Sequence, residues 1–265
     1  PVLKAASELG VPTAVHESNA VPGLTTKMLE GAVDTIMVGF EESRANYKHP
    51  DRVKVTGTPV RVDFLSQSKA QAKRELGIPE DRPLVASVWG SLGAAHMNEI
   101  MTDFIVRACA KPFFNLIHSA GKARYSRMKD ALEREKPDYA RLGMDVRDYI
   151  YDMPRVMAAA DLVLCRAGAS TLAELTAMGK PAILVPSPNV TNNHQEKNAR
   201  VLEEAGGAKV MLEQDFTADS LLGLVSELLQ RPERLKEMSQ NMLGLGVPDA
   251  TDRIADIVLG LAERK

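Results

Sequence analysis

Residues 84–101 read LVASVWGSLGAAHMNEIM, and this stretch decides the fold. The apolar run from Leu84 to Trp89 predicts a buried strand, and the residues after the glycines have helical spacing. Glycines at such a junction let backbone N–H groups approach a ligand closely, and the helix start offers positive potential to an anion such as a diphosphate. The motif is neither a Walker loop nor the full dinucleotide fingerprint, so a turn that only avoids a steric clash is an equal alternative.

A second strand, turn and helix follow downstream, where residues 161–186 read DLVLCRAGASTLAELTAMGKPAILVP. Small residues at 167–169 form the predicted turn, and we expect the helix to open at Ser170 or Thr171. Turns at the carboxyl ends of parallel strands meet in the crevice where open α/β sheets bind ligands. Glu174 stands three residues after Thr171, which favours a capping box, although its carboxylate could also accept two hydrogen bonds from a ribose diol.

The rest of the chain alternates short apolar runs with helical segments, which predicts an α/β protein with parallel sheets. We expect strands at residues 13–16, 34–38, 52–56, 84–89, 114–118, 144–149, 161–165, 181–186 and 208–212. The polar, proline-containing segment 66–83 is the predicted linker. It separates an incomplete first domain at 1–65 from a full doubly wound domain at 84–247, and a closing helix at 248–265 is placed to pack back on the first domain.

Composition excludes several classes of protein. The 265 residues include 33 basic and 35 acidic side chains, well mixed, with a formal charge of -2, so no polybasic arm indicates nucleic acid. Cys109 and Cys165 have no partner at metal-ligand spacing, and no apolar run approaches the roughly 20 residues that span a bilayer. We expect a soluble or peripheral protein. Residues 1–13 read as a helix end running into a strand, which predicts an N-terminally truncated unit.

A third motif is a Pro-Asn loop leading into a helix, where residues 185–208 read VPSPNVTNNHQEKNARVLEEAGGA. Amide side chains both donate and accept hydrogen bonds, so Asn192, Asn193 and Gln195, with His194 among them, could hold the hydroxyls of a sugar. Ordinary N-capping by asparagine is the alternative. Nothing in this cluster has zinc-ligand spacing.

Two motifs in the first half carry further polar residues, HESNAVPGLTTK at 16–27 and VKVTGTPVR at 53–61. His16 is a weak candidate for a catalytic base, because a lone histidine at a strand end more often makes structural hydrogen bonds. Arg61 could pair with a phosphate through its planar guanidinium, against the alternative of a surface arginine. No Ser-His-Asp order or G-x-S-x-G elbow supports a hydrolase.

Taken in order, six segments closely resemble the bacterial N-acetylglucosaminyltransferases of peptidoglycan synthesis. They are HESNAVPGLT (16–25), GTPVR (57–61), GSLGA (90–94), YIYDM (149–153), RAGASTLAE (166–174) and NNHQEKNA (192–199). The resemblance covers essentially the whole chain and implies the GT-B fold, two Rossmann-like domains with parallel sheets facing across a cleft. It also implies an inverting transfer of GlcNAc from UDP-GlcNAc to the C4 hydroxyl of undecaprenyl-diphosphate-linked muramyl-pentapeptide, which converts lipid I into lipid II. The enzyme would lie peripherally on the cytoplasmic face of the cell membrane.

The resemblance further implies a UDP-GlcNAc pocket. The residues that it assigns to the donor are Arg61 and Ser91 at the diphosphate, Ile150 at the uracil through a backbone group, Ala169, Ser170 and Thr171 at the sugar or phosphate, Glu174 at the ribose, His194 and Gln195 at the GlcNAc hydroxyls, and Asn19 from the first domain. It implies no cofactor and no metal, because helix N-termini and Arg61 can stabilise the leaving diphosphate.

The chain departs from the family pattern in two places. The family's loop usually begins with two glycines and has Gln after the serine, whereas here Trp89 precedes Gly90 and Leu92 follows Ser91. The family's first glycine-rich loop, whose histidine is thought to act at the acceptor hydroxyl, is absent from this chain. The catalytic base is therefore unassigned, and we expect negligible turnover by this chain alone. The alternatives are another UDP-sugar enzyme, such as a lipid glucosyltransferase or an epimerase, and a non-catalytic nucleotide-sugar-binding remnant.

Overall fold

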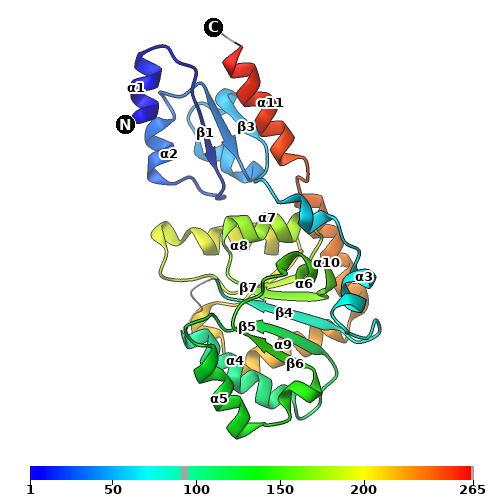
Figure 1. The fold of residues 1–265 in the computed structure, drawn as a ribbon. Coiled ribbons are helices and arrows are strands. Elements are labelled where there is room, and N and C mark those ends of the chain that lie inside the picture. Colours follow the sequence, from blue (N-terminus) through cyan, green and yellow to red (C-terminus); the bar gives the residue numbers. More distant parts are fainter. Residues whose placement is uncertain (91–94, 264–265) are drawn as a thin grey trace.

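The computed structural model describes residues 1–90 and 95–263, which form two α/β units, one above the other in Figure 1. The smaller unit holds a parallel sheet in the order β1-β2-β3, and the larger unit holds a parallel sheet in the order β6-β5-β4-β7-β8-β9. The two parallel sheets confirm the predicted α/β class. In the described part of the chain, the nine predicted strands are all present, with ends shifted by up to two residues.

The smaller unit consists of β1 (Ala14–Glu17), β2 (Thr35–Val38), β3 (Val53–Val55) and the helices α1 (Val2–Glu8) and α2 (Leu24–Leu29). Its core is centred on β2, where Ile36 and Val38 are fully buried and pack with Val33 and Val53. The central strand is buried because both faces of a parallel sheet are covered.

The strands of the larger sheet are β4 (Leu84–Val88), β5 (Asn115–Ser119), β6 (Met144–Arg147), β7 (Leu162–Cys165), β8 (Ala182–Leu184) and β9 (Ala208–Val210). At the centre β4 pairs with β7, from Val85 with Leu162 to Val88 with Cys165. The chain moves outward in one direction from β4 and in the other from β7, so the strand order reverses between them. Such a reversal opens a crevice at the carboxyl ends of the strands, where doubly wound proteins bind ligands.

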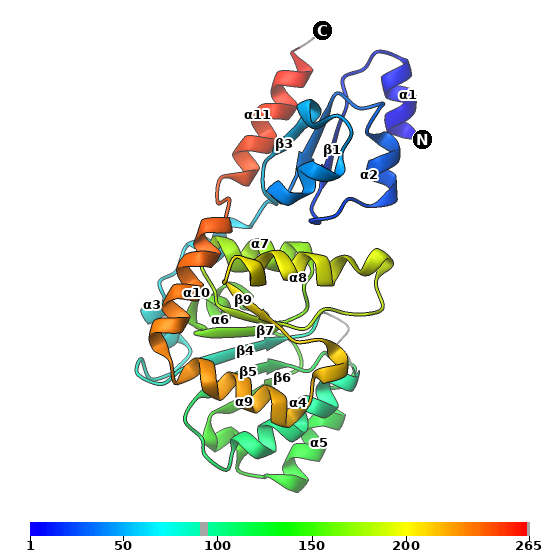
Figure 2. The same cartoon turned by 180° about the vertical axis from the view of Figure 1, so that it is seen from behind.

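Helices cover both faces of this sheet. One core contains Phe104 of α4 (Ala95–Ala108), Leu132 of α5 (Tyr125–Glu135) and Leu221 of α9 (Ala218–Leu229). The opposite core contains residues of α3 (Lys69–Glu75), α6 (Met153–Ala159), α7 (Ala169–Ala177) and α8 (His194–Glu204). Helix α10 (Pro232–Leu245) contributes to both cores. Both views of the ribbon place α7 and α8 between the two sheets (Figures 1 and 2).

Short 3-10 helices occupy some of the connections. Those described lie at Glu41–Asn46, Pro50–Arg52, Val62–Leu65, Tyr139–Leu142, Thr191–Asn193 and Glu213–Asp215.

The predicted linker 66–83 is folded onto the larger unit. Ala72 of α3 is fully buried in the same core as Val156 of α6, and Phe64, just before the segment, joins that core as well. Leu76 and Ile78 pack against the same core, so the segment is not a free spacer.

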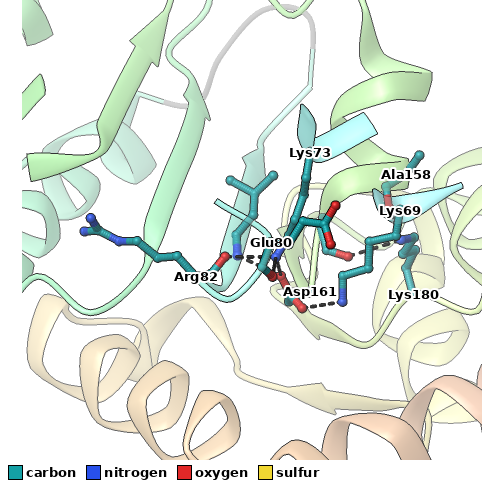
Figure 3. A network of polar contacts seen from close by, with 9 residues as sticks. Lys69, Lys73, Glu80, Arg82, Ala158, Asp161 and Lys180 are labelled. Carbon is teal, nitrogen blue, oxygen red and sulfur yellow. Dashed lines mark hydrogen bonds and ion pairs between the residues drawn. The ribbon is translucent and has the colours of Figure 1, made fainter. Parts of the chain in front are cut away.

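An ionic network fastens α3 to the amino edge of the larger sheet (Figure 3). Asp161 pairs with Lys69 and, at 3.0 Å, with Lys73, and it accepts a hydrogen bond of 2.8 Å from the backbone N–H of Leu84. Burial by itself would raise the pKa of Asp161, but these hydrogen bonds and charges hold it below its usual value. Lys180 donates to the backbone carbonyls of Ala158 and Ala160 at the carboxyl end of α6, and burial lowers its pKa to about 8. The network lies at the edge opposite the crevice.

The chain returns to the smaller unit at its end. Helix α11 (Ala250–Ala262) runs beside β3 in both views (Figures 1 and 2). The crossing point is Gly57, which has a φ of 73° and whose added Cβ would lie 2.5 Å from Cβ of Val247. A left-handed backbone and this close approach both require glycine here.

Candidate functional site

The carboxyl ends of β4 and β7 are neighbours at the point where the strand order reverses. Gly90, just past β4, has a φ of 91°, and an added Cβ would meet no described protein atom within 4 Å. Its requirement for glycine therefore comes from the backbone conformation. Ser91, the expected diphosphate contact, lies outside the described residues, and α4 starts at Ala95.

The start of α7 faces the same crevice from β7. The helix begins at Ala169, one or two residues earlier than expected, with Gly168 as its N-cap, and no described side chain caps it. The predicted capping box is wrong, because Thr171 is the third helical residue and not the cap. The N–H groups of Ala169, Ser170 and Thr171 therefore have no partner within the helix and carry the positive end of its dipole. This is an anion-binding arrangement.

Glu174 lies on the same helix and is half-buried, and its carboxylate makes no hydrogen bond to any described residue. Burial raises the pKa of Glu174, while the charge of Arg61 opposes that rise and Asp63 adds to it. Arg61 is 3.4 Å from Asp63 and its guanidinium stacks 5.1 Å from the Phe64 ring. The charge of Arg61 thus acts on Glu174 without an ion pair between the two side chains, and the carboxylate keeps its acceptor capacity for a ligand.

Ile150 follows β6 at the same edge of the sheet. Its side chain is buried, and its backbone N–H and C=O make no hydrogen bond to the described residues. Tyr149 and Tyr151 flank it with their ring centroids 4.9 Å apart, and the ammonium of Lys122 lies 5.7 and 5.3 Å from the two rings. The backbone at Ile150 is therefore available to a planar base.

The predicted sugar-binding residues lie at the start of α8. His194 is its first residue, and its Nδ1 is 2.9 Å from the carbonyl oxygen of Thr191. A carbonyl only accepts, so Nδ1 carries a proton, and in the neutral ring Nε2 is the acceptor. Gln195 Oε1 accepts from the backbone N–H of Ser187 at 2.9 Å, which orients its amide and leaves the NH2 group as donor. Next to them, a pocket is lined by His96, Pro186, Pro188, Asn193, Glu196, Leu212, Glu213 and Gln214.

Asn19, in the smaller unit, is held at this site by Asn198, a residue that the sequence analysis did not single out. Asn198 of α8 is fully buried. Its Oδ1 accepts from the backbone N–H of Ala20 at 2.8 Å, and its Nδ2 donates to Asn19 Oδ1 at 3.0 Å. The one available signal was a polar residue on the buried face of an amphipathic helix, beside Ala199 and four positions after His194.

His16 and Glu17 organise the loop that carries Asn19. His16 Nε2 donates to the carbonyl of Gly57 at 2.8 Å, and Nδ1 is 3.3 Å from the Ser18 hydroxyl, so both ring nitrogens are engaged. The Glu17 carboxylate accepts hydrogen bonds from Asn19, Gly23 and Thr26. Burial opposes ionisation of Glu17, yet these bonds lower its pKa, so the carboxylate remains charged and holds the loop.

A second pocket lies between the two units, beside α7. It is lined by Gly39, Phe40, Glu41, Glu42, Val55, Gly57, Thr58, Ala169, Leu172, Ala173, Thr176, Gly244, Leu245, Gly246 and Val247. Because the ends of β2 and β3 face the first turn of α7 here, the smaller unit forms one wall of the crevice.

No helix within residues 1–90 and 95–263 is long and apolar enough to cross a membrane. No cluster of three or more His, Cys, Asp or Glu side chains in that part of the chain is arranged to hold a metal ion.

Comparison with known proteins agrees with this geometry. Residues 85–254 match the family model described as glycosyltransferase family 28 C-terminal domain. Over the whole chain, 42% of residues are identical to UDP-N-acetylglucosamine–N-acetylmuramyl-(pentapeptide) pyrophosphoryl-undecaprenol N-acetylglucosamine transferase of Acetivibrio thermocellus, and the match covers 71% of that relative. The protein of the same name from Bacillus cytotoxicus is 38% identical, again over all of this chain and 71% of the relative.

Solved structures agree as well. The crystal structure of MurG from Acinetobacter baumannii superimposes with a TM-score of 0.76 and 25% identity, over 97% of this chain and 69% of that one. UDP-GlcNAc 2-epimerase from Neisseria meningitidis, bound to UDP-GlcNAc, has a TM-score of 0.67 at 14% identity over 97% and 72% of the two chains, which shows a shared fold alone. The chain therefore belongs to the family of UDP-N-acetylglucosamine–N-acetylmuramyl-(pentapeptide) pyrophosphoryl-undecaprenol N-acetylglucosamine transferases.

Proposed function

We propose that this chain binds UDP-GlcNAc at the carboxyl edge of the larger sheet and serves the transfer of GlcNAc to a lipid-linked muramyl-pentapeptide. The transfer inverts the anomeric carbon, because the C4 hydroxyl of the muramyl sugar attacks it directly and UDP leaves. Family membership supports the substrates. The observation that carries the location is the uncapped start of α7 with Glu174 one and a half turns further along the same helix.

In this proposal the first turn of α7 holds the diphosphate. The free N–H groups of Ala169, Ser170 and Thr171 donate to its oxygens. These hydrogen bonds stabilise the diphosphate more strongly as negative charge develops on the leaving group. Arg61 adds a guanidinium from the connection between the units. Ser91, which lies outside the described residues, is the further diphosphate contact that the family resemblance implies.

The remaining contacts place the nucleoside and the sugar. Glu174, whose carboxylate has no competing hydrogen bond among the described residues, accepts from the ribose diol, and the free backbone at Ile150 pairs with the uracil. His194 and Gln195 hold the GlcNAc hydroxyls with one acceptor and one amide donor. Asn19, held by Asn198, closes the site from the smaller unit.

Titration calorimetry tests the donor assignment. We expect UDP and UDP-GlcNAc to bind, UDP-glucose to bind more weakly than UDP-GlcNAc, and EDTA to leave affinity unchanged. Arg61→Ala and Glu174→Ala should each weaken binding about tenfold, the value of one hydrogen bond to a charged group. Arg74→Ala is the matched control, because Arg74 is equally exposed and pairs with Glu80 away from the crevice. If neither site variant changes the affinity, the nucleotide binds elsewhere and the assignment fails.

Epimerisation of a UDP-sugar is the alternative that the sequence analysis left open, and the likeness to the 2-epimerase shows only a shared fold. Incubating the chain with UDP-GlcNAc and following the sugar by NMR separates the two functions. We expect no epimer to form without acceptor, whereas accumulation of a 2-epimer would favour epimerisation.

We also propose that the protein acts at the cytoplasmic face of the cell membrane as a peripheral protein, because its acceptor is anchored in lipid. Co-sedimentation with vesicles containing the lipid-linked acceptor should exceed that with acceptor-free vesicles. Equal sedimentation with both would contradict recruitment by the acceptor.

A further inference from the structure

A buried polar chain lies directly beneath the end of β4. Trp89 is 4% exposed, and its Nε1 donates to the Ser87 hydroxyl at 2.9 Å. The same hydroxyl is 3.0 Å from Nδ1 of His118, whose Nε2 is 3.3 Å from Oδ1 of Asn98. Asn98 Nδ2 in turn donates to the carbonyl oxygen of Ala120 at 2.7 Å. Ser87 and His118 are fully buried, and Asn98 is 5% exposed.

The carbonyl of Ala120 fixes the direction of every bond in this chain. A carbonyl only accepts, so the Asn98 amide turns its NH2 group to Ala120 and its oxygen to His118. His118 therefore donates from Nε2, Nδ1 is an acceptor, and the Ser87 hydroxyl donates to it. That hydroxyl oxygen accepts from the Trp89 indole. One tautomer of His118 satisfies all members, and burial keeps the ring neutral by lowering its pKa to about 3.

The chain joins three segments at the crevice. Ser87 and Trp89 belong to the end of β4, Asn98 lies in the first turn of α4, and His118 and Ala120 lie at the end of β5. The two flanks of the glycine-rich turn are thus tied to each other through the imidazole of His118. The indole of Trp89 is held further by Phe216, with ring centroids 5.3 Å apart.

We propose that His118 is a positioning residue for the donor diphosphate, acting through Trp89 and Asn98 on the backbone at the end of β4 and the start of α4. This inference rests on the proposed function. Backbone donors bind a diphosphate well only when their spacing is fixed beforehand, and a rigid ring with a donor on one edge and an acceptor on the other fixes it. The chain also explains how this protein accommodates Trp89 at a glycine position of its family: the indole points into the core and leaves the backbone available.

The test compares two substitutions at His118 by titration with UDP. His118→Leu fills the space but leaves the Ser87 hydroxyl and Asn98 Oδ1 unpaired, and UDP affinity should fall about tenfold. His118→Gln offers an amide oxygen and an NH2 group in the same order, and it should restore affinity to within about threefold of wild type. A purely structural role would lower the melting temperature in both variants without separating their affinities.

Val225→Ala, a fully buried change on α9 in the same core, controls for destabilisation alone and should leave UDP affinity unchanged. All variants are compared at a temperature where circular dichroism shows them folded. If wild type binds UDP and His118→Leu binds it equally well, the positioning role is wrong while the proposed function stands. If wild type does not bind UDP, the proposed function itself fails.

Discussion

At the scale of single residues, the crevice contains groups whose ionisation differs from that of exposed side chains. Glu174 is a carboxylate that burial destabilises and that no described residue stabilises by a hydrogen bond. Glu17, by contrast, is ionised because its loop donates to it. A half-buried carboxylate without a protein donor loses part of its hydration in the free protein, and it becomes useful when a ligand supplies the donors.

Glu174→Gln should therefore raise the melting temperature of the free chain while weakening UDP binding. The raised pKa means that the ionised side chain opposes folding at neutral pH, and the neutral amide removes that cost. As the pH is lowered, the affinity of wild type for UDP should begin to fall at a pH above the range in which an exposed glutamate titrates. The Glu174→Gln variant should lack that dependence. Thermal unfolding and calorimetry at several pH values measure both effects. A variant that loses stability at pH 7 would contradict this account.

His118 should make the free energy of unfolding depend on pH. Its pKa is about 3 in the folded chain, far below the 6.5 of an exposed histidine, so the unfolded chain binds a proton first as the pH falls. The stability that it contributes is complete above pH 6.5 and is lost progressively from there toward pH 3. Between pH 7.5 and pH 5, wild type should lose about 2 kcal/mol relative to His118→Gln. Parallel urea-unfolding curves at both pH values test this; equal losses would mean that His118 is not buried as a neutral ring.

At the scale of elements, the site consists of helix starts aimed at one point by two neighbouring strands. Helix α7 lacks a side-chain cap, and a glycine at its N-cap leaves its first N–H groups open. The smaller unit faces this helix across the pocket beside α7, where the connection from α10 to α11 passes under Gly57. The packing of Gly57 against Val247 therefore helps to set the position of the smaller unit, which forms one wall of the crevice.

Gly57→Ala should destabilise the chain by about 2 to 5 kcal/mol, the sum of a left-handed backbone cost and a steric clash with Val247. Gly77→Ala is the matched control, because Gly77 has a φ of 69° but no atom within 4 Å of its added Cβ. It should cost only the backbone term, about 1 to 2 kcal/mol. Urea unfolding measures both, and adding Val247→Ala to Gly57→Ala should recover part of the difference. Equal costs for the two alanine variants would show that the crossing is not tightly packed.

At the scale of the whole molecule, two α/β units meet around α7 and α8 (Figures 1 and 2). Asn198 bridges them with one accepted and one donated hydrogen bond, three residues beyond the predicted sugar contact Gln195. A change in the relative position of the units would therefore move Asn19 with respect to the donor site.

Asn198→Ala should loosen the two units, because the N–H of Ala20 loses its acceptor and a buried N–H without a partner costs about 1 to 3 kcal/mol. Deuterium exchange in the peptide covering residues 16–27 should speed up, and small-angle scattering should report a larger radius of gyration. Asn241→Ala removes a comparable bond to Gly206 inside the larger unit and should leave both measurements unchanged. Unchanged exchange in residues 16–27 of Asn198→Ala would rule out the bridge.

The sequence by itself determined the succession of elements. Apolar runs such as 84–88 and 162–165 are buried on both faces, so composition and length alone mark them as strands of a parallel sheet, and helical spacing marks the segments between them. The strand assignments also predicted candidate residues after β4, β7 and β3, because parallel sheets of this kind bind ligands at the carboxyl ends of their strands. The resemblance in motifs added the identity of the ligand.

Only the tertiary structure decided which of these residues act together. The spacing of Thr171 and Glu174 fits a capping box, but the helix starts two residues before Thr171, because Gly168 takes the cap position where the strand turns. The bridge from Asn198 to Asn19 joins positions 179 residues apart, and the chain from Trp89 to Ala120 depends on three segments meeting under one edge. The periodicity of a segment indicates which of its faces is buried. The partner of a buried polar group, by contrast, depends on how elements distant in sequence pack together.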